Sequence, residues 1–452
     1  MSKLFYFGSA ILFFGYLFRI YFSEKIKLKP ETMVTLAFAI FMLIVIRGAQ
    51  RTLFLSTPII CLFAAYFVVN IFVYFRKTDD DLVKMFLGIL FLIVVVLSIM
   101  SVNSFMVNSK AQSAGSKQPI GGTQWQSAMA WTRNNTPIGS IFVHWWDYGY
   151  MVQYMGQRPT LADGGHFEGA FRDHMIGRYL LTTPKPETAL SFLKSNNVSY
   201  LLIDPSDIGK YTAYSSIGSD NSGDDRTSYM PTMVMDPSQT QETNNSEIRF
   251  YQNGVYVDKD IVYNQSGKEI FLPQGQAIVA GFILEIKKGK DNAVSFEQPK
   301  AVFVYNNQQI SIPLRYLYDG KNMIDYKNGL EAGVDMIPYG SFNGQNIQIS
   351  QFGAGIYLSE KTFNSLVAQL YLMNDPFGKY KTIIVAHSEQ DPLVQSLRSQ
   401  GMQVGDFVFA NGLRGPLEIW DTRNIPENIL YKEEFLRNTG TYAEFDNLSF
   451  TK

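Results

Sequence analysis

Residues 141–150 combine the side-chain types that could grip a small polar group. They read Ile-Phe-Val-His-Trp-Trp-Asp-Tyr-Gly-Tyr. Adjacent aromatic side chains can wall a pocket and exclude water, and Asp147 supplies a hydrogen-bond acceptor at its floor or edge. Such a pocket would suit a hydroxyl or an amide group. The simpler alternative is a core strand whose two tryptophans are buried and whose aspartate caps the next helix.

The local sequence predicts which elements would position these side chains. Ser140–Val143 is mainly apolar and is expected to form a short buried strand. Gly149 carries no Cβ, so it would let the chain turn sharply. Trp145 and Trp146 would point to opposite sides of an extended chain. They can therefore wall one pocket only if a turn or a helix begins at this point.

A second candidate pair follows a strand expected at Val198–Ile203. Asp207 and Lys210 are three residues apart, so they would lie on one face of a helix. Taken alone, such a pair is most simply an exposed ion pair of little energy. Ile217 lies further along the same segment, and a lone isoleucine is most simply part of the core.

The first part of the chain, residues 1–107, predicts a membrane region. The first, third and fourth of its apolar segments are long enough to cross a bilayer, and the second must borrow from its flanks. Lysines and arginines gather at 24–31 and 76–84, which the positive-inside rule places in the cytoplasm. About four transmembrane helices would then leave the large carboxy-terminal part outside the cytoplasm. The segments are Leu4–Tyr21, Thr32–Ile46, Thr52–Phe75 and Leu82–Val102.

Two arginines, Arg47 and Arg51, lie between the second and third apolar segments. They could be interfacial residues whose charged ends reach for water. They could also clamp an anion, because guanidinium groups match the geometry of phosphate oxygens.

The remainder predicts a mixed α/β core with an all-β insert. A linker expected at Ser104–Pro119 leads from the membrane region into residues 108–247. These residues are expected to alternate helices and strands and to end in a mobile polar loop, Ser219–Asn245. Residues 248–350 alternate short β-branched runs with turns, as in a barrel or sandwich. Residues 351–452 would return to the core and finish as a small terminal β unit. The expected core elements are Gln124–Asn134, Thr160–Ala162, Phe171–Thr182, Glu187–Asn196 and Thr362–Leu372, and the expected terminal strands are Lys381–Ala386, Gly405–Ala410 and Leu417–Asp421.

Composition limits the possible partners. The formal net charge is −1, which gives no reason to expect nucleic acid. Cys61 is the only cysteine, so no intrachain disulfide can form. His166 and His174 stand near several acids and invite a metal interpretation, but their spacing fits no strong zinc template. The acids are Asp163, Glu168 and Asp173.

The run Trp145-Trp146-Asp147-Tyr148-Gly149 resembles the signature pentapeptide of the oligosaccharyltransferase catalytic subunits, the family that includes archaeal AglB. The resemblance implies that Trp145, Trp146 and Asp147 hold the hydroxyl of the Ser or Thr two residues after the acceptor Asn. A site built to hydrogen-bond a hydroxyl rejects analogues without one, because its own buried polar groups would be left unpaired.

Two other segments match the same family in the same order. Asp207 and Lys210, followed by Ile217, resemble its second motif, which lies on a kinked helix beside the pocket. By this resemblance Lys210 forms a second wall, Asp207 orients it, and Ile217 touches the Thr methyl group; Gly209 would favour the kink. The segment that begins at Arg51 resembles the one whose arginine holds the pyrophosphate of the lipid-linked donor.

The resemblance implies a membrane glycosyltransferase that acts outside the cytoplasm. It would transfer a glycan from a dolichyl-type pyrophosphate donor to the Asn of Asn-x-Ser/Thr sequons. The family uses a divalent cation, Mg²⁺ or Mn²⁺, whose main ligands lie in amino-terminal loops that cannot be placed in this chain. No catalytic residue and no metal ligand is therefore assigned here. The β-rich insert and terminal β unit resemble the archaeal branch more than the bacterial one.

Met1 lies just downstream of the position where the last acid of that family would be expected. We therefore expect a truncated or split gene product that is incomplete on its own, with an amino-terminal part encoded separately. Two other functions remain open. One is a membrane-anchored module that binds sequons or glycans without catalysis. The other is a related glycosyltransferase with a different acceptor.

Overall fold

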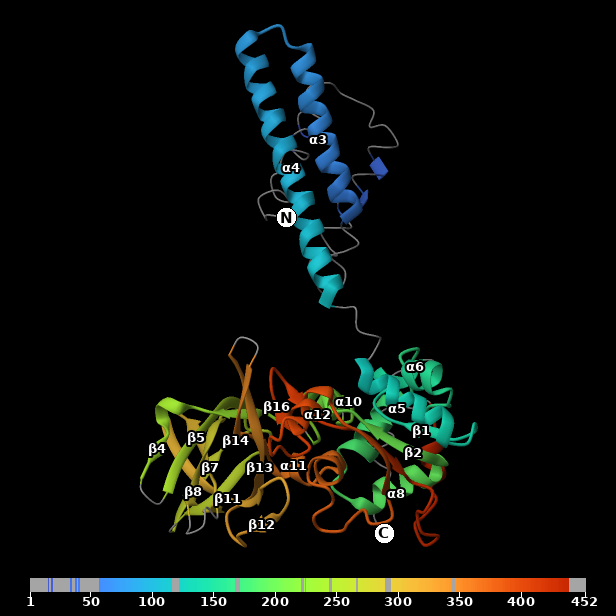
Figure 1. Cartoon of the computed structure of the whole chain (residues 1–452), viewed down its shortest axis with the longest axis vertical. Coiled ribbons are helices and arrows are strands. Elements are labelled where there is room, and N and C mark those ends of the chain that lie inside the picture. Colours follow the sequence, from blue (N-terminus) through green and yellow to red (C-terminus); the bar gives the residue numbers. More distant parts are fainter. Residues whose placement is uncertain are drawn as a thin grey trace. The chain divides into compact units, whose positions relative to one another are not determined.

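The computed structural model divides the chain into two compact units, residues 1–117 and residues 118–452 (Figure 1). The ranges that it describes are 57–115, 122–166, 171–220, 225–243, 246–265, 267–288, 294–343 and 346–438, together with residue 223 and a few isolated positions before residue 57.

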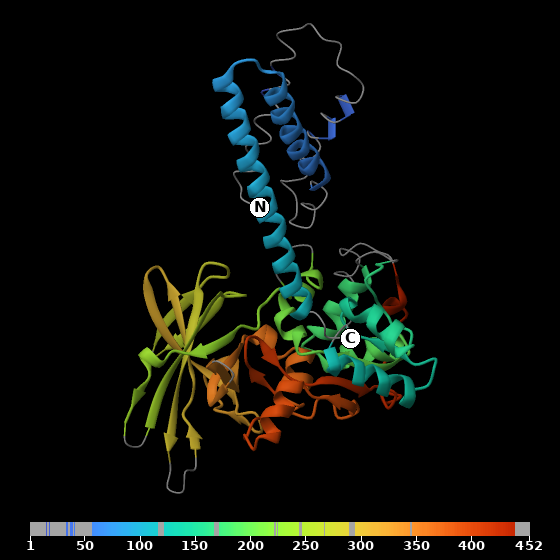
Figure 2. The ribbon, with the colours of Figure 1, turned by 45° about the horizontal axis from the view of Figure 1, so that its top comes forward.

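In the first unit two helices pack side by side (Figures 1 and 2). They are α3, Thr57–Lys77, and α4, Asp81–Gly115. The side chain of Asp80 caps α4 by accepting a 2.9 Å hydrogen bond from the backbone N–H of Leu82. Within α4, Asp81–Ser113 is long and apolar enough to cross a membrane, and only 6% of its most apolar window is buried. No other helix in the described residues meets both criteria.

The four-span prediction is therefore not settled by the described residues. Most of Leu4–Tyr21 and Thr32–Ile46 lies outside them, as do Arg47 and Arg51. The linker expected at Ser104–Pro119 is wrong over most of its length, because α4 continues to Gly115. Polar side chains are compatible with that helical extension, and Ser113 Oγ donates to the carbonyl of Lys110 at 3.1 Å.

The second unit contains a four-stranded sheet in the order β1-β2-β18-β15. The central strand β2, Val198–Ile203, is almost entirely buried, as expected for a strand covered on both faces. β1, Ile141–Val143, runs parallel to β2, so the chain between them must cross over, and it does so through helices. β18, Leu417–Asp421, and β15, Ile384–Glu389, complete the sheet. The helices of this crossover include α7, Phe171–Ile176, the π-helix η4, Gly177–Leu181, and α8, Pro186–Ser195. Another helix, α5, Gly122–Asn135, precedes β1.

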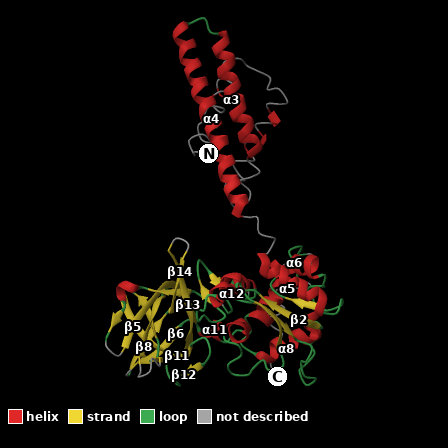
Figure 3. Ribbon diagram, in the orientation of Figure 1, coloured by secondary structure: helices red, strands yellow, loops and turns green. Residues whose placement is uncertain are grey.

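A larger antiparallel region gathers most of the other strands, as Figure 3 shows. Its path is β12-β11-β10-β8-β5-β3-β14-β13-β16-β17, and β11 also pairs with β13. That extra pairing closes the path from β11 to β13 on itself. A β-rich region was expected, but the closed path also takes in β3, which precedes the expected insert at residues 248–350. The strands are β3 Thr232–Met235, β4 Gln241–Glu242, β5 Ser246–Tyr256, β8 Ile278–Lys288, β9 Val294–Phe296, β10 Lys300–Tyr305, β11 Gln308–Tyr318, β12 Met323–Asp325, β13 Leu330–Asn343, β14 Asn346–Leu358, β16 Val408–Phe409 and β17 Leu413–Arg414, with a separate hairpin of β6 Ile261–Gln265 and β7 Lys268–Leu272.

Three sequence predictions need correction here. The segment Ser219–Asn245, expected as a loop, contains β3 and β4. Thr160–Ala162 is not a strand but makes one isolated bridge, from Thr160 to Phe142. The last strands do not form a terminal β unit. β18 pairs with β2 and buries the side chains of Leu417 and Ile419 in the core, and β15 pairs with β18. Both strands therefore belong to the four-stranded sheet.

The segment expected as a helix at Thr362–Leu372 is divided into two pieces. α11, Glu360–Phe363, is followed by the π-helix η7, Val367–Leu372. Phe363, Leu366 and Val367 are buried in the same cluster as β2 and β18, so this face packs on the α/β core as predicted. The second unit also contains η5 Pro237–Gln239, α12 Pro392–Ser399 and η8 Glu433–Leu436.

Candidate functional site

The aromatic segment lies where β1 ends and helical turns begin. Trp145 is still extended, with φ −65° and ψ 140°, and Trp146–Tyr148 then forms the short 3₁₀ helix η2. It continues into α6, Gly149–Met151, and η3, Val152–Gly156. This is the strand-to-helix change that the two tryptophans require if they are to lie near each other. Their ring centroids are 6.3 Å apart.

The side chains of the segment differ in how far they reach solvent. Trp145 is only 2% exposed, and its ring packs 5.6 Å from that of Tyr214. Trp146 is half-buried and meets the ring of His166 at 4.6 Å. The side chain of Asp147 is 29% exposed. In this structure Trp145 therefore supports the site from the core, while Trp146 and Asp147 can contact a ligand.

Gly149 is required here for a different reason from the expected one. Its φ of −53° and ψ of −50° are ordinary helical values, so it makes no sharp turn. A Cβ at this position would lie 2.3 Å from Cβ and 2.5 Å from Cα of Asp163. The glycine therefore allows the helical turn to approach the segment around Asp163 closely.

Lys210 comes from a separate segment and contacts two members of the motif. Its Nζ lies 2.8 Å from Oδ2 of Asp147 and donates a 3.0 Å hydrogen bond to Oη of Tyr148. The same nitrogen lies 4.3 Å from the centre of the Tyr148 ring. The Lys210 side chain is 30% exposed. Asp147 and Lys210 thus form an ion pair that remains accessible.

Beneath this pair, Asp207 is 2% exposed and accepts hydrogen bonds on both oxygens. Tyr148 Oη donates to Oδ1 at 2.8 Å, and the backbone N–H of Asp204 donates to Oδ2 at 3.0 Å. Burial raises the pKa of Asp207 to about 7, and the charge of Asp204 adds to the rise. Burial also raises the pKa of Tyr148 well above its usual value.

Lys210 reaches Asp147 because the helix is interrupted at that residue. α9, Ser206–Gly209, ends and α10, Tyr211–Ile217, begins on either side of Lys210, whose φ and ψ are −91° and 0°. A Cβ on Gly209 would meet no atom within 4 Å, so close packing does not require this glycine. The interruption agrees with the expected kink, but it is centred on Lys210.

Residues 139–256, which contain all of these groups, match the family model described as the STT3/PglB/AglB core domain. This part of the chain is therefore similar to that core domain. Over 214 residues, or 47% of its length, the chain is 30% identical to dolichyl-phosphooligosaccharide-protein glycotransferase 1 of Pyrococcus horikoshii. This match covers 21% of that relative. Glycotransferase 2 of the same organism is 20% identical over 80% of the chain and 39% of its own length.

Among solved structures, the apo oligosaccharyltransferase of Archaeoglobus fulgidus has a TM-score of 0.50 and 13% identity. The likeness covers 92% of this chain and 45% of that one, and it supports a shared fold. The matched region spans well under half of the curated relatives named above.

The third residue of the second motif lies at the far end of α10 in the core domain. Ile217 lies seven positions after Lys210, which corresponds to about 10 Å along a helix axis. The Ile217 side chain is partly buried against the main core. Its carbonyl accepts a 2.6 Å hydrogen bond from Nδ1 of His174. The proposed contact of Ile217 with a Thr methyl group stays a prediction.

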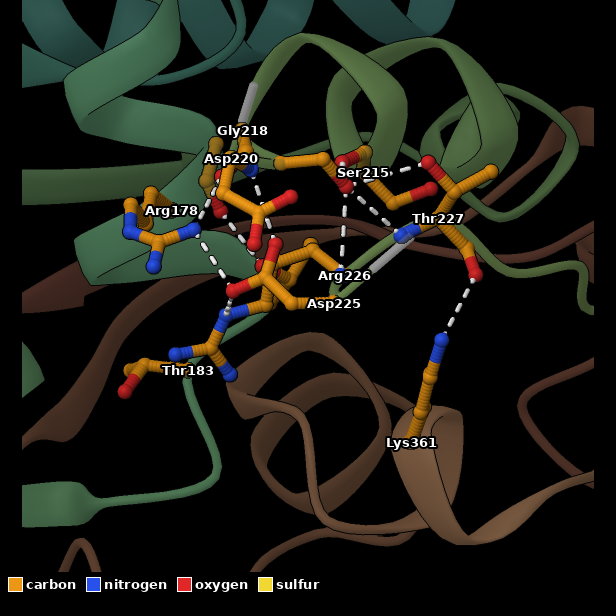
Figure 4. Close-up of polar contacts among 12 residues, drawn as sticks. Arg178, Thr183, Ser215, Gly218, Asp220, Asp225, Arg226, Thr227 and Lys361 are labelled. Atoms are coloured by element: carbon orange, nitrogen blue, oxygen red, sulfur yellow. Dashed lines mark hydrogen bonds and ion pairs between the residues drawn. The ribbon is translucent and has the colours of Figure 1, made fainter. Parts of the chain in front are cut away.

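A polar cluster fixes the chain that leaves α10 (Figure 4). Arg178 donates to the carbonyl of Gly218 at 3.0 Å and pairs with Asp225 at 2.7 Å. Ser215 Oγ accepts from the backbone N–H of Ser228 at 3.2 Å, and Lys361 donates to the carbonyl of Thr227 at 3.4 Å. These bonds connect the end of α10 to η4 and α11, so both ends of the helix are held.

The histidines and acids considered as metal ligands are used in other ways. His166 Nδ1 lies 2.9 Å from Oδ2 of Asp173, whose pKa burial raises to about 6. Asp163 accepts from Nε2 of Gln153 at 2.7 Å. Glu168 lies outside the described residues. Across the part of the chain that the structure describes, no group of three or more His, Cys, Asp or Glu could hold a metal ion.

Sequence reasoning missed the two residues that connect the motifs. Tyr148 bonds to both Lys210 and Asp207, and Asp204 accepts from Nε1 of Trp125 at 2.9 Å. A signal was available for Tyr148, because a buried tyrosine hydroxyl usually needs a hydrogen-bond partner. One connected hydrogen-bond network therefore runs from Trp125, which precedes the matched residues 139–256, to the exposed Asp147–Lys210 pair.

Proposed function

We propose that the chain acts in protein N-glycosylation, as a glycosyltransferase that moves a glycan from a dolichyl-type pyrophosphate donor to the Asn of an Asn-x-Ser/Thr sequon. Within it, Trp146, Asp147 and Lys210 would bind the hydroxyl of the Ser or Thr. The observation that carries this proposal is the accessible Asp147–Lys210 pair, 2.8 Å long, at the surface of the core domain.

The pair suits a hydroxyl because a hydroxyl both donates and accepts. The Asp147 carboxylate can accept its proton, and the Lys210 ammonium can donate to its oxygen. The half-buried ring of Trp146 lies beside Asp147 in the chain and would limit access of water. A peptide with Ala in place of Thr would leave both charged groups without their partner. This gives selectivity for the hydroxyl.

Tyr148 and Asp207 would act as positioning residues. Both are buried, and Tyr148 joins Asp207 to Lys210 through two hydrogen bonds. Trp145 has the same role from the core side, through its contact with Tyr214. Holding Lys210 in place before the peptide arrives lowers the ordering cost of binding.

The proposed setting is a membrane, crossed several times, with residues 118–452 outside the cytoplasm. The length and apolar surface of α4 support a membrane-spanning role. The named Pyrococcus relatives support a dolichyl-linked donor. Arg51 remains our candidate for the donor pyrophosphate. The proposed cofactor is a divalent cation, Mg²⁺ or Mn²⁺, and no step is assigned to a metal ligand among the described residues of this chain.

A peptide-binding titration tests the proposed hydroxyl site. The full chain in detergent would be titrated with an Asn-x-Thr peptide and with its Asn-x-Ala counterpart. We expect a preference of at least about tenfold for Thr, because unpaired polar groups penalise the Ala peptide. Asp147→Ala and Trp146→Ala should both abolish the preference, while Asp79→Ala, which changes an exposed acid in the first unit, should retain it. An unchanged preference in Asp147→Ala would contradict the proposal.

A transfer assay separates catalysis from recognition. Glycosyl transfer from a lipid-linked donor to the Thr peptide would be measured with the full chain, in Mg²⁺ or Mn²⁺. Transfer supports the proposed glycosyltransferase. Thr-dependent binding without transfer would support the alternative of a membrane-anchored sequon-binding module.

A further inference from the structure

A cavity of about 900 Å³ lies between the two sheets of the second unit. The β-rich region contributes Asp335 on β13 and Phe352 on β14, and the four-stranded sheet contributes Glu418 on β18. Tyr371 on η7 and Phe407 close other sides. We call it the inter-sheet cavity. Its volume is in the range of sites that bind small organic molecules.

Asp335 is the most unusual residue in this cavity. It is 1% exposed, and its Oδ2 has no hydrogen-bond partner among the residues that the structure describes. Burial raises its pKa well above the usual value. A buried polar atom without a partner costs free energy, so its presence points to a group that the structure does not hold.

Glu418 places a second carboxyl in the cavity wall. It is half-buried, and burial together with the nearby charge of Asp406 raises its pKa to about 8. Its one described hydrogen bond, from Ser388 Oγ, is long at 3.4 Å. Asp335 and Glu418 come from different sheets, so a ligand that contacts both would have to extend across the cavity.

The other charged groups in the wall do not offset these two acids. Asp319 accepts from the backbone N–H groups of Lys321 and Asn322, and Asp406 pairs with Arg398 at 2.8 Å. Among the described residues that line the cavity, Lys321 is the only lysine or arginine. The wall therefore favours a positively charged occupant.

The aromatic side chains favour an organic cation over a metal ion. Tyr318, Phe352, Tyr371 and Phe407 all line the cavity, and the rings of Tyr371 and Phe407 stand nearly perpendicular at 5.1 Å. Aromatic faces attract ammonium and guanidinium groups and also cover alkyl chains. The described residues contain no cluster of three or more metal-binding side chains, and the cavity is far larger than a single ion needs.

We propose that the inter-sheet cavity binds a small organic polycation, with one cationic nitrogen at Asp335, a second at Glu418 and its alkyl chain against the aromatic rings. This site is separate from the Asp147–Lys210 pair and does not rest on the proposed glycosyltransferase function.

Calorimetric titration with spermidine tests the proposal on the full chain in detergent. Because burial raises the pKa of Glu418 to about 8, this carboxyl is largely protonated near neutral pH, and binding of a cation beside it should release its proton. The measured enthalpy should therefore change with the ionisation enthalpy of the buffer. Affinity should also increase when the pH is raised from about 6 to about 8, because the carboxyl of Glu418 then loses its proton more easily while spermidine keeps its charge.

Two variants and one control locate the site. Glu418→Gln and Asp335→Asn should each weaken spermidine binding by about tenfold or more and reduce proton release. Glu269→Gln makes the same chemical change at an exposed glutamate of β7 and should leave both the affinity and the proton release unchanged. If Asp335→Asn fails to fold, the spermidine affinity of Glu418→Gln alone still tests the proposed site. Equal affinity in Glu418→Gln and wild type, or no spermidine binding by wild type, would overturn the proposal.

Two other probes address different occupants. Calcium chloride and a neutral disaccharide would be titrated under the same conditions. Neither should bind measurably if the cavity selects an organic cation. Binding of calcium that competes with spermidine would identify a metal site, and binding of the disaccharide without spermidine would identify a neutral polar ligand. Either result would replace the proposed occupant.

Discussion

Two buried aspartates in the same unit show opposite solutions to the same physical problem. Asp207 and Asp335 are 2% and 1% exposed, and burial raises the pKa of each. Asp207 has a donor for each oxygen, from Tyr148 and from the backbone of Asp204. Asp335 has an oxygen without a partner in the described structure.

This contrast distinguishes a structural residue, Asp207, from a candidate ligand-binding residue, Asp335. The Asp207 network is complete without any ligand, so it can hold Lys210 rigidly before a peptide binds. The Asp335 side chain would gain a partner only when the inter-sheet cavity is occupied. Buried acids are therefore not evidence of one function, and what distinguishes them is whether their hydrogen bonds are already made.

Replacing each aspartate by leucine should give the largest difference in the free energy of unfolding. Asp207→Leu removes the acceptor of two buried donors, and we expect the free energy of unfolding to fall by about 3 kcal/mol. Asp335→Leu removes an unpartnered polar group of similar shape, and we expect a gain of about 1 kcal/mol. Denaturant unfolding followed by tryptophan fluorescence would measure both, because all five tryptophans lie in residues 118–452. Destabilisation of the same size in both variants would contradict the contrast.

Substitutions of Gly149 and Gly209 test how closely the backbone packs around the candidate site. Gly149→Ala would place a Cβ 2.3 Å from that of Asp163, and we expect a loss of about 2 kcal/mol because the backbone must shift. Gly209→Ala meets no atom within 4 Å in α9, so it should be neutral or stabilising by up to about 1 kcal/mol. The same unfolding measurement applies. Similar losses in both variants would show that Gly149 is not in close contact with the Asp163 segment.

The sequence predicted elements well where burial and pattern agree. The strands Val198–Ile203 and Leu417–Asp421 match the structure at both ends, since each is a short apolar run that the core covers. The short strand expected at Ser140–Val143 is present as β1, but helical turns follow it in place of the expected sharp turn at Gly149. The order of Leu417–Asp421 in the sheet could not be predicted, because pairing with β2 joins segments more than 200 residues apart.

The candidate site was predicted as two motifs but not as one network. The pattern of Asp207 and Lys210 suggested that they partner each other, whereas Lys210 pairs with Asp147 and reaches Tyr148, 62 residues away in the chain. Helical spacing predicts which residues share a face of a helix. It does not predict which residue of another segment forms the ion pair with Lys210. Asp335 carried no local signal at all, because its lack of a partner is a property of the folded core.

The pH dependence of stability gives a further test of the Asp207 environment. Its pKa of about 7 in the folded state lies above the value of about 3.9 for an unfolded Asp, so the folded state binds more protons between those values. Its contribution to stability is therefore fully present below about pH 4 and is lost as the pH rises through about 7, by at most about 1.4 kcal/mol for each pH unit.

Comparing wild type with Asp207→Asn isolates this contribution. Asp173 and Glu418 also have raised pKa values and give slopes of the same sign, but they are present in both proteins. The difference in unfolding free energy between the two proteins should thus depend on pH between about 4 and 7. A difference that stays constant over this range would mean that Asp207 is ionised in the folded protein throughout.

The smallest effect on stability is expected at the exposed pair itself. Asp147 and Lys210 have side chains that are 29% and 30% exposed, so solvent screens their attraction, and Lys210→Met should change the free energy of unfolding by less than about 1 kcal/mol. The same variant should nevertheless lose the preference for an Asn-x-Thr peptide over Asn-x-Ala, because the donor to the hydroxyl is gone. Lys210→Arg keeps the charge and should retain part of that preference. A variant that unfolds easily but still discriminates between the peptides would reverse the division of roles, and would place Lys210 with Asp207 in the structural support.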